Sequence, residues 1–145
     1  MKTASDVVSR FPGRWVILLF IAVVWVGCGD DDGASDGVSG DYEVDERVML
    51  NLDFSPDPPE VGATELWMEL RVDGAPYEGA DFVVEPWMPS HGHGSNTHPV
   101  ALDEGDGLYW VDDLVFTMAG HWELLIEVEY EDSVAELVVD LEVDG

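Results

Sequence analysis

Residues 122–143 read WELLIEVEYEDSVAELVVDLEV, and the apolar and acidic residues of this segment alternate in a way that indicates the fold class. Apolar side chains occupy every second position from Trp122 to Tyr130, and glutamates fill several of the positions between them. After a short Glu-Asp turn, the same period of two runs from Ala135 to Val143. Because successive side chains of a strand point to opposite faces, this pattern predicts two antiparallel strands with one buried face each.

The same period of two extends toward the N-terminus. It recurs in VMLNLDF (residues 48–54), TELWMELRV (64–72) and ADFVVEP (80–86). The turn DEGDG (103–107) separates PVAL from LYWV and predicts a hairpin. No stretch of this region has a helical period. About seven short strands between turn signals predict an all-β fold, an immunoglobulin-like sandwich of two antiparallel sheets over residues 42–145.

The first 27 residues have the organisation of a secretory signal peptide. A basic segment with Lys2, Arg10 and Arg14 precedes an apolar run over residues 15–26. That run is shorter than the about 20 residues that a membrane-spanning helix needs. The sequence therefore predicts that residues 1–27 direct export.

The junction VGCGDDD resembles the processing site of bacterial lipoproteins, with Cys28 as the residue that would carry the lipid. The resemblance implies a protein anchored in the cell envelope by a diacylglycerol thioether, which gives stable membrane attachment. Gly29 rather than aspartate after the cysteine implies the outer membrane, with the domain facing the periplasm or the cell surface. The small and acidic residues of 28–41 predict a disordered tether.

The charge balance argues against nucleic acid and anionic lipid headgroups as partners. The chain has 32 acidic residues against five basic ones, and its formal net charge is −27. Such a surface repels nucleic acid and anionic headgroups, and it favours cations, cationic partners or simple solubility. Since Cys28 is the sole cysteine, a lipidated chain has neither a disulfide nor a thiolate metal site.

The loop WMPSHGHGSNTHPV (residues 87–100) contains three of the four histidines. Counting strand crossings predicts that this loop and the turn TMAGH (117–121) lie at the same end of the sandwich. That end would then gather all six candidate metal ligands, which are His91, His93, His121, Met88, His98 and Met118.

These residue types favour copper. Neutral imidazole binds copper, zinc and nickel, and a thioether adds a preference for soft Cu(I). Ligands must be deprotonated, so we expect metal binding to weaken in mild acid. The alternative is a flexible polar turn, with the two methionines as core residues and His121 capping the core beside Trp122.

The stretches GAPYEGADFVVEPWMPSHGHG and GLYWVDDLVFTMAGHWELLIEV resemble the YtkA-like and FixH-like domains of bacterial envelope proteins. Met88, Pro89, His91 and His93 match the first motif of those domains, and Gly120 with Trp122 matches the second. The resemblance covers roughly residues 62–143. It implies an immunoglobulin-like sandwich in the envelope, with a link to copper handling or cytochrome oxidase assembly.

Two functions are therefore expected to compete. The first is a copper chaperone or buffer that delivers its ion to an envelope partner without catalytic turnover. The second is a structural or binding module that holds another envelope protein without metal. We do not expect an enzyme, because the chain offers no thiol nucleophile and no acid pair that stands out among its many carboxylates.

Overall fold

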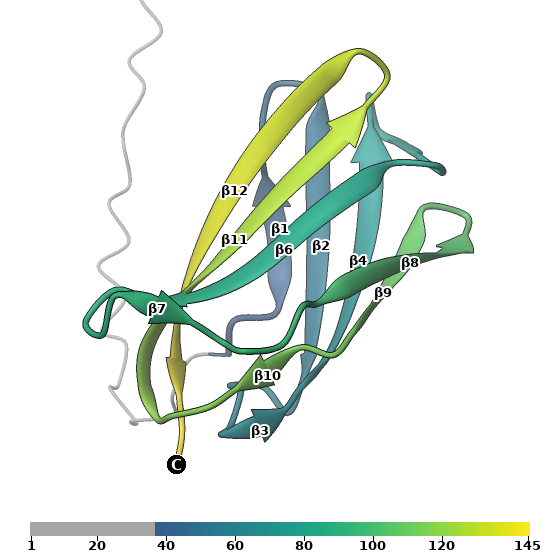
Figure 1. Ribbon diagram of the computed structural model, residues 1–145. Coiled ribbons are helices and arrows are strands. Elements are labelled where there is room, and N and C mark those ends of the chain that lie inside the picture. The colour runs from purple at the N-terminus through teal and green to yellow at the C-terminus, as the bar shows by residue number, and fades with distance from the viewer. Residues whose placement is uncertain (1–36) are drawn as a thin grey trace, which may run out of the picture. The chain divides into compact units, whose positions relative to one another are not determined.

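The computed structural model describes residues 37–145 as two antiparallel sheets packed face to face (Figure 1). The predicted signal peptide, Cys28 and residues 28–36 of the predicted tether lie outside the described residues. Within residues 37–145, no helix is long and apolar enough to cross a membrane.

The first sheet has the strand order β1-β2-β4-β9-β8, and β5 pairs with the C-terminal end of β4. These strands are β1 (Gly40–Glu43), β2 (Val48–Ser55), β4 (Glu65–Val72), β5 (Ala75–Pro76), β8 (Val100–Gly105) and β9 (Leu108–Asp112). The second sheet has the order β12-β11-β6-β7. Its strands are β6 (Asp81–Met88), β7 (His93–Gly94), β11 (Gly120–Tyr130) and β12 (Ser133–Val143). A short pair, β3 (Gly62–Ala63) with β10 (Val115–Phe116), lies at one end.

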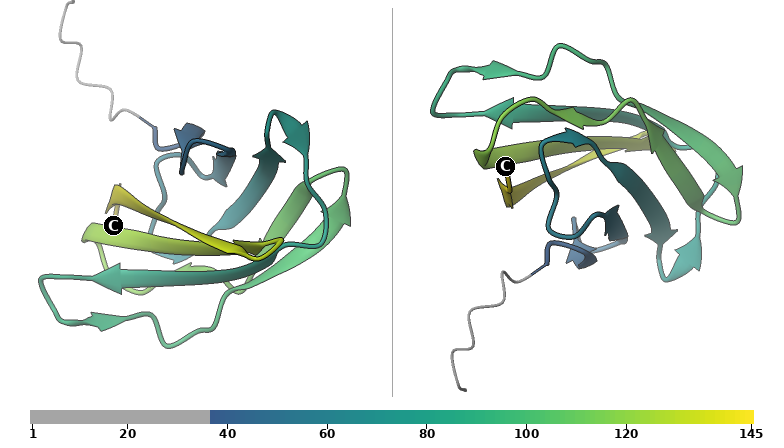
Figure 2. Two further views of the ribbon diagram at one scale, coloured as in Figure 1. Left: turned by 90° about the horizontal axis from the view of Figure 1, so that it is seen from above. Right: turned by 90° about the horizontal axis from the view of Figure 1, so that it is seen from below.

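The core lies between the two sheets and consists of the inward rows that the alternation predicted (Figure 2). Each sheet contributes one apolar row per strand, for example Val48 to Phe54 in β2 and Trp122 to Tyr130 in β11. Burying one such side chain contributes about 1.5–3 kcal/mol. The predicted immunoglobulin-like sandwich class is confirmed, because the described residues form antiparallel sheets without a helix.

The folded domain begins earlier than composition suggested. Gly40 and Asp41, which the sequence assigned to the tether, pair with β2 as part of β1. The backbone N–H groups of Val38 and Ser39 donate hydrogen bonds to the Asp57 carboxylate at 2.6 and 3.2 Å. Gly40 and Asp41 join the sheet through backbone pairing and add no apolar side chain of their own, so a criterion based on hydrophobicity does not detect them. Val38 and Tyr42 on either side of them pack against the core.

Thr64 is a buried polar residue whose Oγ1 hydrogen-bonds to none of the described residues. Valine has nearly the same shape without the hydroxyl that burial desolvates. We therefore expect Thr64→Val to raise the free energy of unfolding by about 1 kcal/mol, measured by urea denaturation. Thr117→Val, at an exposed position, is the matched control and should change stability little. A destabilised Thr64→Val protein would contradict this account.

Candidate metal site

The two segments that carry the histidines meet at one end of the second sheet, as strand counting predicted. β6 runs antiparallel to β11, and Glu123 pairs with Trp87. The residues after Met88 therefore lie at the same end of the sheet as the residues before Trp122. Figure 1 shows β7 at the end where β11 begins, and β6 lies between these two strands in the sheet. The topological part of the prediction is confirmed.

The side chains at this end nevertheless point in different directions. Trp122 is buried in the core, and so its neighbour His121 projects from the outer face of β11, with its side chain 46% exposed. His93 of β7 pairs with Met88 of β6, and the Met88 side chain points inward to the core. Since paired residues of an antiparallel ladder share a face, His121 and His93 belong to opposite sides of the sheet.

His91 and His93 form a pair of their own. A tight turn follows β6, in which the N–H groups of His91 and Gly92 both donate to the carbonyl of Met88, at 3.1 and 3.0 Å. Gly92 has a φ of 68°, which glycine adopts without strain. The turn places the two exposed imidazole rings 5.7 Å apart, centroid to centroid. His93 Nδ1 lies 2.9 Å from the carbonyl oxygen of Gly94.

The structure does not bring the remaining candidates to this pair. Met88 is only 3% exposed and belongs to the core, so its thioether packs against apolar neighbours. Met118 packs against the core as well, and its carbonyl oxygen accepts a hydrogen bond from Trp122 Nε1 at 3.0 Å. His98 is exposed and lines a depression with Phe82 and Glu85, away from the turn that follows β6.

His121 is grouped instead with carboxylates that were not among the predicted ligands. β11 and β12 form a hairpin in which His121 pairs with Glu142 and Glu123 with Asp140. All four side chains occupy the outward row. Among residues 37–145, the group that brings three ligand atoms within 4.8 Å of one another consists of His121, Glu123 and Asp140.

The spacing of His121 and Asp140 is compatible with two ligands of one metal ion. Nε2 of His121 lies 3.4 Å from Oδ1 of Asp140, which is longer than an ordinary hydrogen bond of 2.7–3.2 Å. With metal–ligand bonds of about 2.0–2.2 Å, two ligands of a tetrahedral ion are separated by roughly 3.3–3.6 Å. One imidazole nitrogen and two carboxylate oxygens suit divalent ions such as Cu²⁺, Zn²⁺ and Ni²⁺ more than Cu⁺.

Glu142 adds a second feature of metal centres. Its Oε1 lies 3.4 Å from Nδ1 of His121, on the opposite side of the ring from Asp140. Histidines that ligate metals commonly direct their other ring N–H toward a carboxylate, which orients the ring and raises its basicity. Glu142 is therefore positioned to orient His121 while Nε2 faces Asp140.

The sequence model of the YtkA-like family matches residues 42–127. The chain belongs to the YtkA-like family. The match to the YtkA-like domain includes the histidine loop, His121 and Glu123, whereas Asp140 and Glu142 follow its end. No curated protein and no solved structure gives a significant match to the chain.

Proposed function

We propose that this YtkA-like protein binds a divalent transition metal ion, most favourably Cu²⁺, through His121, Glu123 and Asp140. The observation that carries the proposal is the convergence of three ligand atoms within 4.8 Å. Copper is favoured because Cu²⁺ has the highest affinity of the first-row divalent ions for a nitrogen and oxygen site. The donor set contains no sulfur, which moves the preference from Cu⁺ to Cu²⁺.

The exposure of the site supports a role in carrying or buffering the ion. The side chains of His121 and Asp140 are 46% and 74% exposed, so an ion bound there is within reach of a receiving protein. The net charge of −27 attracts cations over a distance of the order of the Debye length, about 8–10 Å in physiological salt. The proposal includes lipidation at Cys28 and a place in the outer membrane, facing the periplasm or the cell surface.

Titration of CuCl₂ and ZnCl₂ into the purified protein, followed by calorimetry, tests the proposed ligands. We expect His121→Ala to weaken Cu²⁺ binding by at least about tenfold, because it removes the sole nitrogen ligand of the group. Glu142→Gln should cause a smaller loss, because it removes a carboxylate that orients the imidazole. The affinity should fall as the pH is lowered, since protons compete for the ligands.

Two controls separate this site from the histidine loop. His98→Ala removes an exposed histidine that lies outside the group and should leave Cu²⁺ affinity unchanged. The double variant His91→Ala, His93→Ala should also retain the affinity. Loss of binding in the double variant alone would assign the ion to the loop. Equal affinity in all variants would reduce the binding to unspecific attraction by carboxylates.

A further inference from the structure

Within residues 37–145, no element packs against the outer surface of strands β6, β11 and β12, which carries exposed apolar side chains. Val83, Val134 and Val138 are 57%, 55% and 52% exposed. Leu125 pairs with Val138 across the β11–β12 ladder, and a shallow groove runs between Val83, Leu125 and Val138. Figure 1 shows these three strands side by side. Their opposite surface covers the core, so this groove is open to a partner.

Carboxylates alternate with these apolar side chains along and across the strands. The outward positions of these three strands include eight acidic residues, namely Asp81, Glu85, Glu123, Glu127, Glu129, Glu136, Asp140 and Glu142. None of the outward residues of these strands is lysine or arginine. The two arginines of residues 37–145 are paired elsewhere, Arg47 with Asp73 and Glu131 and Arg71 with Glu69. The negative charge of the face is therefore uncompensated.

We propose that this face docks a basic polypeptide segment that carries aliphatic side chains among its lysines or arginines. The aliphatic side chains would cover Val83, Leu125 and Val138, and the cationic groups would reach the surrounding carboxylates. Apolar contact supplies affinity, while complementary charge speeds association and selects the partner. The inference does not rest on the proposed metal function. Glu123 and Asp140 belong to the same face, but the groove itself is lined by other residues, including Val83, Leu125 and Val138.

Charge also decides against other occupants of the same face. A second copy of this chain would place eight carboxylates opposite eight carboxylates, which is unfavourable at short range. A bilayer with anionic headgroups and a nucleic acid carry the same sign of charge as the face. A basic polypeptide satisfies both the apolar and the electrostatic character of the surface.

The apolar contribution is tested with a synthetic peptide of alternating lysine and leucine, titrated into the purified protein in the presence of EDTA. Fluorescence anisotropy reports its dissociation constant. We expect the double variant Val83→Thr, Val138→Thr to bind the peptide about fivefold more weakly, because a hydroxyl replaces one methyl group of each exposed valine. Threonine keeps the shape and the strand preference of valine. The matched control Val61→Thr, Val100→Thr alters exposed valines away from this face and should bind within about twofold of the parent.

The electrostatic contribution needs a second pair of variants. Glu127 and Glu136 are paired across β11 and β12, and Glu127→Gln with Glu136→Gln should weaken binding and reduce its dependence on salt. Asp53→Asn with Glu65→Gln removes the same charge from the other sheet and should have little effect. Equal losses in both variants would overturn the proposal. So would equal binding of a lysine–serine peptide, or self-association that the Val83→Thr, Val138→Thr variant abolishes.

Discussion

Trp122→Ala is expected to lower the free energy of unfolding by about 3–5 kcal/mol. Trp122 is 0% exposed and lies at the start of β11, where its indole contacts the Phe116 ring edge-on at a centroid distance of 5.4 Å. Alanine would leave a cavity between the sheets. It would also remove the donor of the 3.0 Å hydrogen bond from Nε1 to the Met118 carbonyl. Both losses act in the same direction.

Urea denaturation followed by circular dichroism measures this loss, and Trp67→Ala provides the control. Trp67 projects from the outer face of β4 and is 41% exposed, so its truncation removes less buried surface. We expect Trp67→Ala to lower the free energy of unfolding by less than about 1.5 kcal/mol. A double-mutant cycle with Phe116→Ala should show a coupling of about 0.5–1.5 kcal/mol, because the two rings are in contact. Equal effects at Trp122 and Trp67 would contradict the proposed packing.

The sandwich could be predicted because each sheet buries one face. Apolar residues therefore recur at every second position of a strand, and this pattern is visible in the sequence. The long strands β2, β4, β6, β11 and β12 all follow it. The two-residue strands β3, β5, β7 and β10 were not predicted. They are too short to show a period, and partners distant in the sequence define them, as when Val115 pairs with Ala63.

The sequence was enough to predict at which end of the sandwich the histidines lie, but not whether their side chains converge. Counting strand crossings correctly placed His121 at the same end as His91 and His93. The convergence of these side chains also depends on which face of the sheet each occupies. Since Trp122 belongs to the buried row, its neighbour His121 must point outward, while Met88 continues the buried row of β6. The alternation that predicted the strands therefore contained the reason that Met88 and His121 do not share a ligand sphere.

The carboxylates beside His121 required the register of the hairpin. Tyr130 pairs with Ser133 across the short turn, and this pairing fixes every later partner, including Glu142 for His121 and Asp140 for Glu123. Counting back from the turn would have found both residues. Because the chain has 32 acidic residues, these two could not be selected until the cross-strand pairing was known.

Tyr109→Phe is expected to lower the free energy of unfolding by about 2–3 kcal/mol, because it leaves two backbone groups without a partner. Tyr109 is buried in β9, and its ring packs against Phe82 at a centroid distance of 4.7 Å. The Tyr109 hydroxyl donates to the carbonyl of Tyr77 at 3.0 Å and accepts from the N–H of Ala80 at 3.1 Å. These bonds hold the segment 77–80 that leads into β6.

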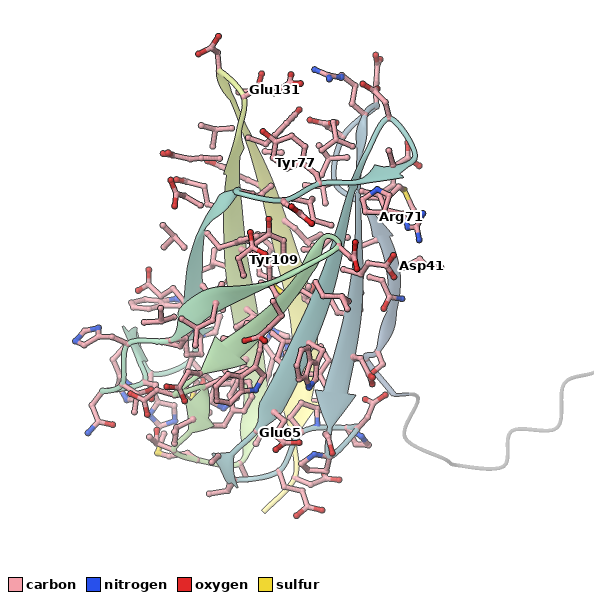
Figure 3. The ribbon with its side chains drawn as sticks, turned by 90° about the vertical axis from the view of Figure 1, so that its right-hand side faces the viewer. Asp41, Glu65, Arg71, Tyr77, Tyr109 and Glu131 are labelled. Carbon is pink, nitrogen blue, oxygen red and sulfur yellow. The ribbon has the colours of Figure 1, made fainter. Side chains whose placement is uncertain are left out.

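The position of Tyr77 explains why one hydroxyl has this effect. Tyr77 lies between Tyr109 and Glu131 in Figure 3, and its own hydroxyl accepts a hydrogen bond from the Glu131 N–H at 3.1 Å. Tyr109 belongs to the first sheet, whereas Glu131 lies in the turn that joins β11 to β12 in the second. The segment 77–80 therefore links both sheets at the end opposite His121. Hydrogen exchange at the Ala80 amide should accelerate in the variant.

Alkaline unfolding gives an independent measure of the same hydroxyl. Burial raises the pKa of Tyr109, and the nearby Asp103 carboxylate acts in the same direction. Because the folded pKa lies above the unfolded value of about 10, the neutral phenol stabilises the fold below pH 10, and this contribution is lost as the pH rises through the folded pKa. Tyr109→Phe should therefore lose less stability than the parent above pH 10. Tyr42→Phe provides the comparison at pH 7. Among the described residues, the Tyr42 hydroxyl makes one hydrogen bond, to the Val38 carbonyl, so its removal should lower the free energy of unfolding less than Tyr109→Phe does. Unchanged stability of Tyr109→Phe at pH 7 would show that other donors and acceptors replace both bonds.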